Sequence, residues 1–376
     1  MKIIVFAKTN LTFDGRILSH LDKLTEGFPK ANILFLLLPD GKTDVNLSPS
    51  IQIKEFNFKL RKFFSKYVIL QFVTALVFAI YQIVTILKYK PKIITVHDLS
   101  AALGPVILSF FTRLNIIYDD HELFERPTNV VEYFWYYVER RILKIANGII
   151  VANKERQKII YFIFKPKCRI VVVENYPYYK NNTQNTQINN ALKEIKKKNK
   201  ILLHQGRIFN ERGAKEIKQI INQLPYDWCF CAIGVPNKEF NALFEEVLYD
   251  KSKFINLGYV NYNEVQSIWN EVDATIIIYK TNFINNRYCA PNRLFFALKT
   301  GIPIIVNKEN PILAETIRNN KNGILIQEDK VCVSSFFENY NKYKENANSI
   351  VSKHTDKEND NKIINIYSLL IKHANL

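Results

Sequence analysis

Short apolar runs alternate with helix-like stretches along most of the chain, and this alternation limits the possible folds more than any other feature. A run such as IITVH at 93–97 is short, apolar and rich in β-branched residues, as a buried strand is. Residues 14–26 and 130–146 have helical spacing, and Asp14 suits the cap position of the first. Strands that alternate with helices form parallel sheets covered on both faces. The expected strands are 2–7, 32–38, 93–97, 115–119, 148–152, 169–173, 201–206, 228–234, 254–260, 273–279, 302–306 and 323–326.

One polar stretch, which is Asn-rich and then basic, interrupts the alternation at 178–199. This composition is typical of a linker between domains. A length of 376 residues also suits two domains. We therefore expect an α/β protein with doubly wound domains over 1–177 and 200–355, joined by a linker over 178–199 and followed by C-terminal helices. Ligands of such folds bind at the carboxyl ends of the strands.

The composition excludes a disordered chain and indicates anionic partners. Hydrophobic residues make up 48% of the chain, which is enough for real cores. The 52 Lys and Arg residues outnumber the 35 Asp and Glu residues, so the net charge is +17. Phosphorylated ligands, an acidic membrane surface or nucleic acid would suit this charge. Because the charge is dispersed and no nucleic-acid-binding module is recognised, we expect no nucleic-acid partner.

The cysteines and the first residues indicate a cytoplasmic protein. The five cysteines are scattered and match neither a zinc site nor a CxxC redox motif, so we interpret them as reduced thiols. The apolar run in MKIIVFAKTN is too short for a signal peptide and is better explained as a buried strand.

The uncharged segment 67–87 has the length of a membrane span. A single span there would place the strand at 2–7 and the strand at 93–97 on opposite sides of the membrane, although we expect both in one sheet. A buried crossover helix and a helix lying on the membrane surface remain as alternatives. Basic residues at its entry favour contact with anionic lipid headgroups; they are Arg61, Lys62 and Lys66.

Two stretches of the second half are suited to bind phosphate. We expect a helix to begin at Pro291, with Ala290 before it and Arg293 adding charge, because the first N–H groups of a helix bind anions well. An ordinary capped helix with a solvated Arg293 is the alternative. In HQGRIFNERG, Arg207 and Arg212 flank a loop between a strand and a helix, and guanidiniums there suit a diphosphate. The alternative is two surface arginines.

Three stretches of the first half carry polar residues directly after a strand. His121 in YDDHELFER is placed to contact a hydroxyl or a phosphate, unless Asp119 or Asp120 merely caps a helix and His121 is exposed. Asp98 in VHDLSAALG is placed to act as a base, unless it caps a helix over 99–112. The stretch TFDGRILSHL lacks the GxGxxG fingerprint, so its single glycine and Arg16 are a weak signal.

The ordered set of these motifs resembles the retaining GT-B glycosyltransferases of family 4 (group 1), which build bacterial envelope polysaccharides. The resemblance covers nearly the whole chain and is carried by DGRILSHLDKL, VHDLSAALG, YDDHELF, VERRILKIANGIIVAN, VVENYP, HQGRIFNERG, LGYVNYNEVQSIW and APNRLFFALKTGIPII. It implies two Rossmann-like domains facing each other across a cleft. The first would be the acceptor side and the second would bind the nucleotide sugar, with a C-terminal helix at 356–376 packing back on the first.

The resemblance also implies roles for single residues. His121 would contact the donor sugar as the catalytic residue, with Asp120, Glu122 and Tyr288 in the same region. The donor diphosphate would be held by Gly206, Arg207, Arg212, Pro291, Asn292 and Arg293. Gly258, Tyr259 and Val260 would lie beside the nucleoside, and Asp14, Arg16, His97 and Asp98 would face the acceptor. The family uses no metal and no cofactor, because cationic and dipolar groups stabilise the leaving diphosphate.

Phe296 departs from the family pattern. Many members carry two glutamates in this region, and counting back from Gly301 puts them at Tyr288 and Phe296. A phenyl ring cannot accept hydrogen bonds from ribose hydroxyls. Three explanations stay open: another residue supplies this contact, the donor is gripped differently, or the protein is a catalytically impaired relative.

We therefore expect a retaining, metal-independent glycosyltransferase that uses a nucleotide-diphosphate sugar. Its acceptor would be a lipid-linked glycan. The enzyme would be cytoplasmic and peripherally bound to the anionic inner face of the plasma membrane. The alternatives are a catalytically impaired partner subunit that binds sugar nucleotide or membrane, and another GT-B enzyme such as a sugar-nucleotide epimerase. The membrane-like helix disfavours the epimerase, because a soluble substrate needs no membrane.

Overall fold

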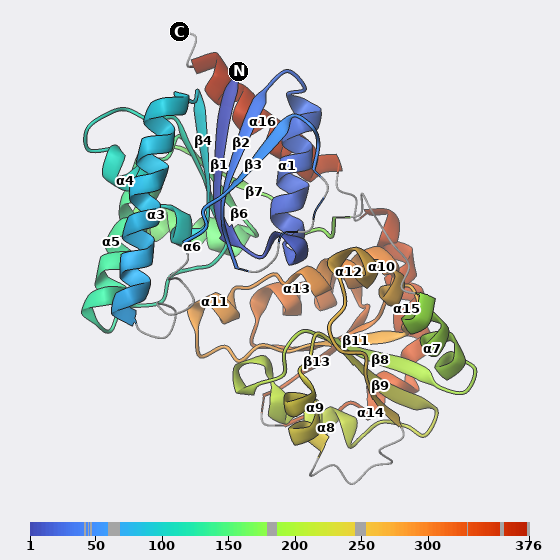
Figure 1. Ribbon diagram of the computed structural model, residues 1–376. Helices are drawn as coiled ribbons and strands as arrows, with labels where there is room; N and C mark the ends of the chain where they lie inside the picture. Colours follow the sequence, from blue (N-terminus) through green and yellow to red (C-terminus); the bar gives the residue numbers. More distant parts are fainter. Residues whose placement is uncertain are drawn as a thin grey trace. The chain divides into compact units, whose positions relative to one another are not determined.

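The computed structural model describes residues 1–40, 43, 45, 47–58, 68–178, 186–244, 253–328, 330–353 and 357–373. The chain divides into two compact units, each with its own sheet (Figure 1). Unit 1 comprises Met1–Glu174 and Asp356–Leu376, and unit 2 comprises Asn175–Thr355. The basic residues at 61, 62 and 66 lie outside the described residues, so their membrane contact stays a prediction.

Unit 1 is built on a seven-stranded parallel sheet in the order β3-β2-β1-β4-β5-β6-β7. The chain builds outward from β1 to β3 and then crosses to the other side of β1, which is the doubly wound order. Strands β4, β5 and β6 are buried along their whole length, because helices cover both faces of the sheet. The strands are β1 (Lys2–Thr9), β2 (Asn32–Pro39), β3 (Ile51–Glu55), β4 (Ile93–His97), β5 (Ile116–Asp120), β6 (Gly148–Val151) and β7 (Arg169–Val172).

Among the described strands of this sheet, β3 is the one that the sequence pattern did not predict. It lies at the edge and pairs with β2 alone. Its sequence, IQIKE, has a buried Ile51 and is otherwise partly or fully exposed. An edge strand packs against fewer neighbours, so it lacks the continuous apolar run that marks the inner strands.

Helices α1 and α16 lie together on one face of this sheet, and α3, α4 and α5 lie on the other (Figure 1). The side chain of Asn359 on α16 exchanges two hydrogen bonds with the backbone of Glu174, which fixes the end of the chain to unit 1. The helices are α1 (Gly15–Gly27), α3 (Val68–Tyr89), α4 (Leu103–Leu108), α5 (Val130–Ile145), α6 (Lys154–Phe164) and α16 (Lys357–His373), with short 3₁₀ helices η1 (Leu11–Phe13) and η2 (Leu99–Ala101).

Helix α3 contains the segment that has the length of a membrane span. The stretch Gln71–Tyr89 has a mean hydropathy of 1.8, and a third of its window is buried. The helix connects β3 to β4, and β4 pairs directly with β1, as the topological argument from the sequence required. Gln82 is buried and hydrogen-bonds to the backbone of Ala101 and Gly104, which ties α3 to the neighbouring helices η2 and α4. The helix is therefore a crossover helix of unit 1.

The helix expected over 99–112 is shorter than predicted. It is divided into η2 and α4, and Asp98 makes no capping hydrogen bond with its side chain. Asp98 instead has φ of 65°, a left-handed conformation that is uncommon outside glycine. Asp98 is thus the N-cap residue of η2 by position, but no capping hydrogen bond of its side chain supports the alternative in which it serves as a helix cap.

Unit 2 repeats the doubly wound order with six parallel strands, β10-β9-β8-β11-β12-β13. Separate clusters of buried side chains cover the two faces, one around Trp269 and the other around Trp228. The strands are β8 (Lys200–Gln205), β9 (Trp228–Ile233), β10 (Phe254–Asn256), β11 (Ala274–Ile277), β12 (Ile304–Asn307) and β13 (Gly323–Ile326).

The stretch predicted as a linker contributes a helix to unit 2. Helix α7 (Thr186–Lys196) buries Leu192 completely in the core, with Ile188 and Ile195 packed beside it. These three residues are spaced by about one helical turn and form one apolar face of the helix. The polar composition of the rest of the stretch concealed this face in the sequence pattern. The other helices of unit 2 are α8 (Ala214–Ile221), α9 (Asn237–Phe244), α10 (Tyr262–Trp269), α11 (Ile284–Arg287), α12 (Asn292–Thr300), α13 (Pro311–Asn320), α14 (Ser334–Glu338) and α15 (Tyr340–Ile350), with η3 (Asn210–Arg212) and η5 (Val351–Lys353).

Candidate functional site

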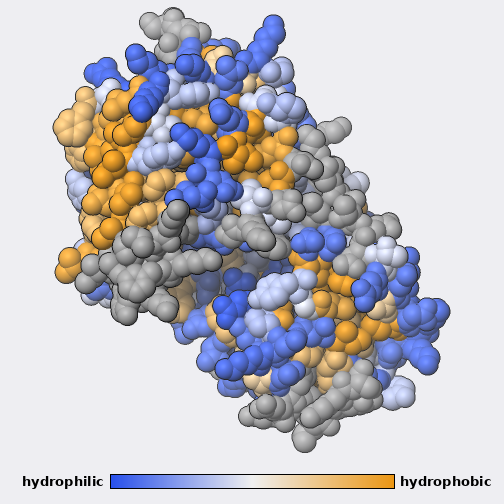
Figure 2. Space-filling view, viewed as in Figure 1, coloured by the Kyte–Doolittle hydropathy of each residue, from blue (hydrophilic) through white to orange (hydrophobic). Residues whose placement is uncertain are grey.

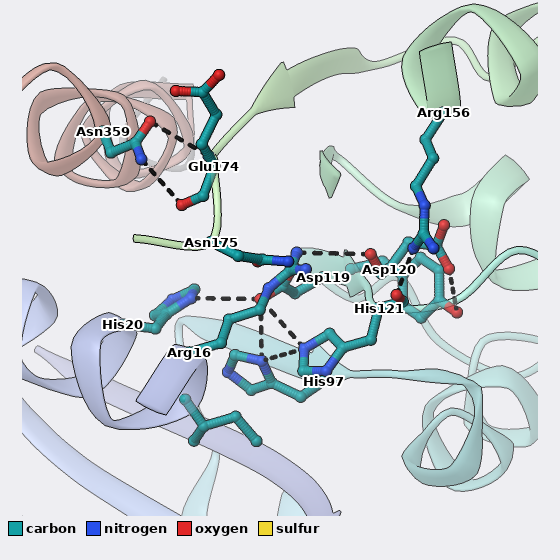
Figure 3. A network of polar contacts seen from close by, with 12 residues as sticks. Arg16, His20, His97, Asp119, Asp120, His121, Arg156, Glu174, Asn175 and Asn359 are labelled. Atoms are coloured by element: carbon teal, nitrogen blue, oxygen red, sulfur yellow. Dashed lines mark hydrogen bonds and ion pairs between the residues drawn. The ribbon is translucent and has the colours of Figure 1, made fainter. Parts of the chain in front are cut away.

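The carboxyl ends of β4 and β5 in unit 1 carry a polar network centred on Asp119 (Figure 3). Arg16 donates a hydrogen bond to Oδ1 of Asp119. Oδ2 lies 3.0 Å from Nδ1 of His97, 3.4 Å from Nε2 of His121 and 3.7 Å from Nδ1 of His20. One buried carboxylate thus holds an arginine and orients three imidazoles.

Asp119 remains ionised because of these partners. Burial alone would raise the pKa of Asp119, but the Arg16 guanidinium and the His121 imidazole hold it well below its usual range. The Asp119 carboxylate in turn raises the pKa of His121. Burial and Arg16 lower this pKa, but the effect of Asp119 outweighs theirs and the pKa is raised. His121 therefore carries a proton more readily than an ordinary histidine.

The other two histidines are buried. Burial lowers the pKa of His97 to about 4 despite the opposing Asp119 carboxylate, so this imidazole is neutral. His20 meets the hydroxyl of Tyr367 at 2.8 Å, and Tyr367 also hydrogen-bonds to Thr95. Because Tyr367 lies on α16, the C-terminal helix supports the network from behind.

A second group of carboxyls lies beside this network. Tyr118 donates to Asp120 at 3.4 Å, and Glu139 of α5 is buried close by. Burial raises the pKa of Asp120 to about 7, and burial with the neighbouring carboxylates of Asp120 and Asp98 raises the pKa of Glu139 to about 9. Protons held by these groups keep a cluster of acids from repelling one another.

The structure brings some predicted residues of unit 1 together and separates others. Arg16, His97 and His121 converge on Asp119, whereas Glu122 is exposed. Asp14 caps α1 by accepting a hydrogen bond from Ile17 N at 3.1 Å, as the pattern predicted. The alternative in which Asp119 or Asp120 caps a helix is wrong, because both lie in β5 and the next helix begins at Val130.

His20, His97 and Asp119 offer atoms within 4.8 Å of one another, which is close enough to hold a metal ion. The Arg16 guanidinium, however, already donates to the same carboxylate. A metal cation there would face this guanidinium charge at close range. We therefore interpret the group as a hydrogen-bonding network.

In unit 2, glycines leave the backbone free of side chains at the ends of β8 and β9; we call this bare backbone. Gly206 has φ of 94° and Gly234 has φ of 73°, both in the region that favours glycine. Gly206 N donates to Ile233 O at 2.8 Å, and a Cβ on Gly234 would lie 3.5 Å from the Cα of Gly206. A ligand can therefore approach this backbone closely.

Arg207 follows directly after Gly206 and projects into solvent, with 62% of its side chain exposed. Its guanidinium is paired with Glu239 in the first turn of α9. The other oxygen of Glu239 accepts from Ile208 N at 3.3 Å. The predicted phosphate-binding arginine thus has a carboxylate partner that an anion would have to replace.

Arg212 and Arg293 both lie over the ring of one aromatic residue, Tyr279. The Arg212 guanidinium lies 5.5 Å from the ring centroid and the Arg293 guanidinium 5.0 Å. Arg293 is buried and donates to Gln205 O at 2.9 Å, which ties α12 to the end of β8. The alternative of a solvated Arg293 is wrong, whereas Arg212 is only half-buried.

Helix α12 begins one residue later than predicted. Pro291 is the N-cap residue, with extended backbone, and Asn292 is the first helical residue. The amides of Asn292 and Arg293 precede the helix's own hydrogen-bond ladder, so they are available to an anion. Asn175 donates to Ala290 O at 3.1 Å and steadies the loop before the helix.

Phe296 is a core residue. It is 1% exposed and its ring stacks on Trp269, with centroids 5.3 Å apart and 14° between the planes. Trp269 in turn donates from Nε1 to Gln205 Oε1 at 2.7 Å. The resemblance places Phe296 beside the nucleoside. Its ring instead points into the core, where it fills the space between α10 and α12.

The remaining predicted residues of unit 2 lie on loops. Gly258 has φ of 67° and donates from its backbone N to Asn256 Oδ1 at 3.1 Å, while Tyr259 is 70% exposed. Val260 packs against the core around Trp269, and Tyr288 is half-buried after α11. An exposed aromatic ring at Tyr259 is suited to stack on a planar ligand.

Sequence reasoning missed several of these partners. Asp119 was weighed only as a cap, and His20, Glu239 and Tyr367 were not singled out. His20 lies one helical turn after Arg16, and this spacing, which puts both side chains on one face of a helix, was the sequence signal that could have identified it. No local signal joins Tyr367 to His20, because 347 residues separate them.

Comparisons with known proteins agree with the fold. No protein-family model matches the chain, and no curated protein sequence matches it significantly. Sucrose-phosphate synthase from Thermosynechococcus elongatus is 11% identical with a TM-score of 0.73, covering 99% of this chain and 100% of that one. Anabaena Alr3699/HepE in complex with UDP-glucose is 15% identical with a TM-score of 0.67, covering 99% of both chains. WaaG, a glycosyltransferase involved in lipopolysaccharide biosynthesis, is 12% identical with a TM-score of 0.65, covering 99% of this chain and 98% of that one. The chain therefore has the GT-B fold of these proteins.

Proposed function

We propose that the chain is a retaining, metal-independent glycosyltransferase of the family 4 type, which transfers a sugar from a nucleotide-diphosphate donor to a glycan. The observation that carries this proposal is the cationic surface at the end of β8. Arg207 and Arg212 flank the bare backbone of Gly206 there, and α12 is tied to the same strand end through Arg293. Anabaena HepE, which has the same fold, is solved with UDP-glucose.

Unit 2 would hold the donor and stabilise the leaving nucleotide diphosphate. Arg212 can donate paired hydrogen bonds to phosphate oxygens, and the amides at Asn292 and Arg293 add the positive end of the helix dipole. Arg207 would exchange Glu239 for a phosphate. Once Arg207 has made this exchange on donor binding, all of these groups would be in place before the reaction begins, so they would stabilise developing charge without further rearrangement.

Unit 1 would position the sugar through His121. Asp119 accepts from His121 Nε2, which fixes the imidazole and leaves Nδ1 for a sugar hydroxyl. In a retaining reaction of this type, departure and attack occur on one face of the sugar. The leaving phosphate would accept the proton of the attacking acceptor hydroxyl, so the protein need not supply a separate base.

The proposed acceptor is lipid-linked, and the proposed place is the cytoplasmic face of the plasma membrane. Helix α3 exposes an apolar stripe of Leu76, Ile80, Val84 and Leu87. Figure 2 shows hydrophobic residues gathered on this part of unit 1. Exposed Lys88 and Lys90 follow the stripe. Apolar side chains beside lysines suit a helix that lies on anionic lipid.

A transfer assay tests this proposal. The chain would be incubated with UDP- and GDP-sugars and with membrane lipids from a polysaccharide-producing bacterium, and both nucleotide release and labelled glycolipid would be measured. We expect one donor to give glycolipid in which the anomeric configuration of the donor is kept. An inverted product would contradict the retaining mechanism.

A non-catalytic partner subunit is the second candidate. It is favoured by Phe296, which fills the core where the resemblance expects a ribose-binding carboxylate. Such a protein would bind a sugar nucleotide or the membrane without releasing nucleotide. The same assay, run with calorimetry of donor binding, separates the two candidates.

A further inference from the structure

A cavity of about 440 Å³ lies within unit 1, between the strand ends and helices α3 and α5. Most of its wall is apolar and comes from elements far apart in the sequence. Lys8 and Asp40, both exposed, belong to the polar part of the wall and mark its mouth, while Leu38 is buried at its floor. The apolar wall comprises Leu38, Phe72, Ala75, Leu99, Val131 and Trp135.

The cavity is adjacent to the Asp119 network. His97 ends β4 and lies 3.0 Å from Asp119, whereas Leu99, two residues further on, lines the cavity. Two residues span at most roughly 7 Å of backbone. A molecule in the cavity would therefore have one end close to the residues that we assign to the acceptor.

The same helix connects the cavity to the exposed apolar stripe. Ala75 lines the cavity, and Leu76 begins the stripe on the next face of α3. A chain leaving a lipid surface along this stripe would reach the cavity without crossing a charged surface of the helix. A volume of this size is within the range of sites for small organic ligands.

We propose that this cavity binds the proximal part of the hydrocarbon chain of the acceptor, a single alkyl or isoprenyl chain that carries the glycan. This inference rests on the proposed function and names the class of acceptor. The wall of Phe72, Trp135 and the aliphatic residues excludes water from the chain. Ser100 and Lys8 at the polar part of the wall face the headgroup.

Alkyl β-glucosides of increasing chain length, used below their micellar concentrations, test the proposal by calorimetry on the full chain. Each methylene that enters the cavity should strengthen binding roughly fourfold until the cavity is full. Free glucose should bind weakly. If glucose bound as tightly as the alkyl glucosides, the cavity would be a sugar subsite and the proposal would be overturned.

Variants of α3 separate the cavity from the stripe. Ala75→Phe fills the cavity and should abolish the dependence on chain length, and the smaller Ala75→Leu should shorten the longest chain that still gains affinity. Val84→Phe is the matched control, because it adds the same ring on the exposed stripe. Loss of binding in Val84→Phe with full binding in Ala75→Phe would place the chain on the stripe and contradict the proposal.

Tryptophan emission gives a second readout. Trp135 is the tryptophan of unit 1, and the other two, Trp228 and Trp269, are buried in unit 2. A bromine-labelled alkyl glucoside should quench Trp135, and Trp135→Phe should remove this quenching. Quenching that persists in Trp135→Phe would overturn the assignment.

These titrations need no donor, so their failure is separate from failure of the proposed function. Binding of nucleotide sugars without any dependence on alkyl chain length would overturn the cavity assignment alone. Chain-length dependence without any nucleotide-sugar binding would leave the cavity as a lipid site and reject the glycosyltransferase.

Discussion

The ring of Phe296 stacks on the indole of Trp269, and both side chains are almost completely buried. This contact explains a position where the family resemblance leads one to expect a glutamate. The aromatic pair closes the core between α10 and α12, and Trp269 also holds the end of β8 through Gln205. Phe296 therefore supports, through Trp269, the strand end at which we propose that the donor diphosphate binds.

Phe296→Glu should accordingly destabilise unit 2. A carboxylate would replace a ring in a closed core, so we expect the free energy of unfolding to fall by at least about 3 kcal/mol. Phe296→Leu, which keeps an apolar side chain, should cost about 1.5 kcal/mol or less. Urea unfolding followed by circular dichroism measures both. A stable Phe296→Glu protein that binds nucleotide sugar more tightly would contradict the packing role.

Asp119→Asn should lower the pKa of His121. Asp119 raises this pKa against burial and Arg16, and an amide carries no charge to do so. NMR titration of the histidine rings measures the change, with Glu26→Gln as a control that removes an exposed carboxylate of the same unit. Transfer activity should fall on the order of a hundredfold, since a small misplacement of a positioning group has this effect. An unchanged His121 titration would reject the network.

Glu239→Gln should strengthen donor binding. Glu239 occupies the guanidinium of Arg207, and the glutamine cannot form the ion pair. The affinity for a nucleotide diphosphate should rise severalfold, because the ligand no longer displaces a carboxylate. Calorimetry measures it, with Glu194→Gln as the control for an exposed carboxylate paired with a lysine of unit 2. Weaker binding in Glu239→Gln would show that the carboxylate helps the donor.

Glu139→Gln should change how stability depends on pH. The folded chain keeps a proton on Glu139 up to about pH 9, whereas the ordinary pKa of 4.5 applies when the chain is unfolded. Between these values the folded state binds the extra proton, so Glu139 makes the free energy of unfolding fall as pH rises. The glutamine should remove up to about 1.4 kcal/mol per pH unit of this slope.

Urea unfolding of the full chain, followed in unit 1 across this pH range, provides the measurement. Glu122→Gln serves as the control for an exposed carboxylate. The slope of the control should match that of the native chain. Identical slopes for Glu139→Gln and the native chain would mean that Glu139 is ionised in the fold.

Most of the fold was predictable from the sequence, because inner strands of parallel sheets are continuous apolar runs. The strand β4 was predicted with its observed ends, 93–97. Strand β3 and helix α7 were not predicted, since each buries only one side and looks polar along the sequence. Their identity depends on neighbours that the local pattern does not contain.

The site was predictable in part for the same reason. Residues after strand ends were located by the alternating pattern, so the positions of Arg207 and His121 after β8 and β5 were predicted, while their roles stay predictions. The roles of Asp119 and Glu239 depend on which distant side chains face them. Phe296 shows the limit most clearly: its place in a motif suggested a ligand contact, but its packing against Trp269 is a tertiary property.

Donor binding by calorimetry tests the central claim most directly, using a panel of UDP- and GDP-sugars with the native chain, Arg212→Ala and Arg318→Ala. Arg318 is an exposed arginine near the end of α13 and controls for loss of charge in unit 2. We predict that one donor binds the native chain and Arg318→Ala equally. Arg212→Ala should bind it roughly tenfold to a hundredfold more weakly. Equal binding by Arg212→Ala, or no binding of any nucleotide sugar by the folded native chain, would contradict the account.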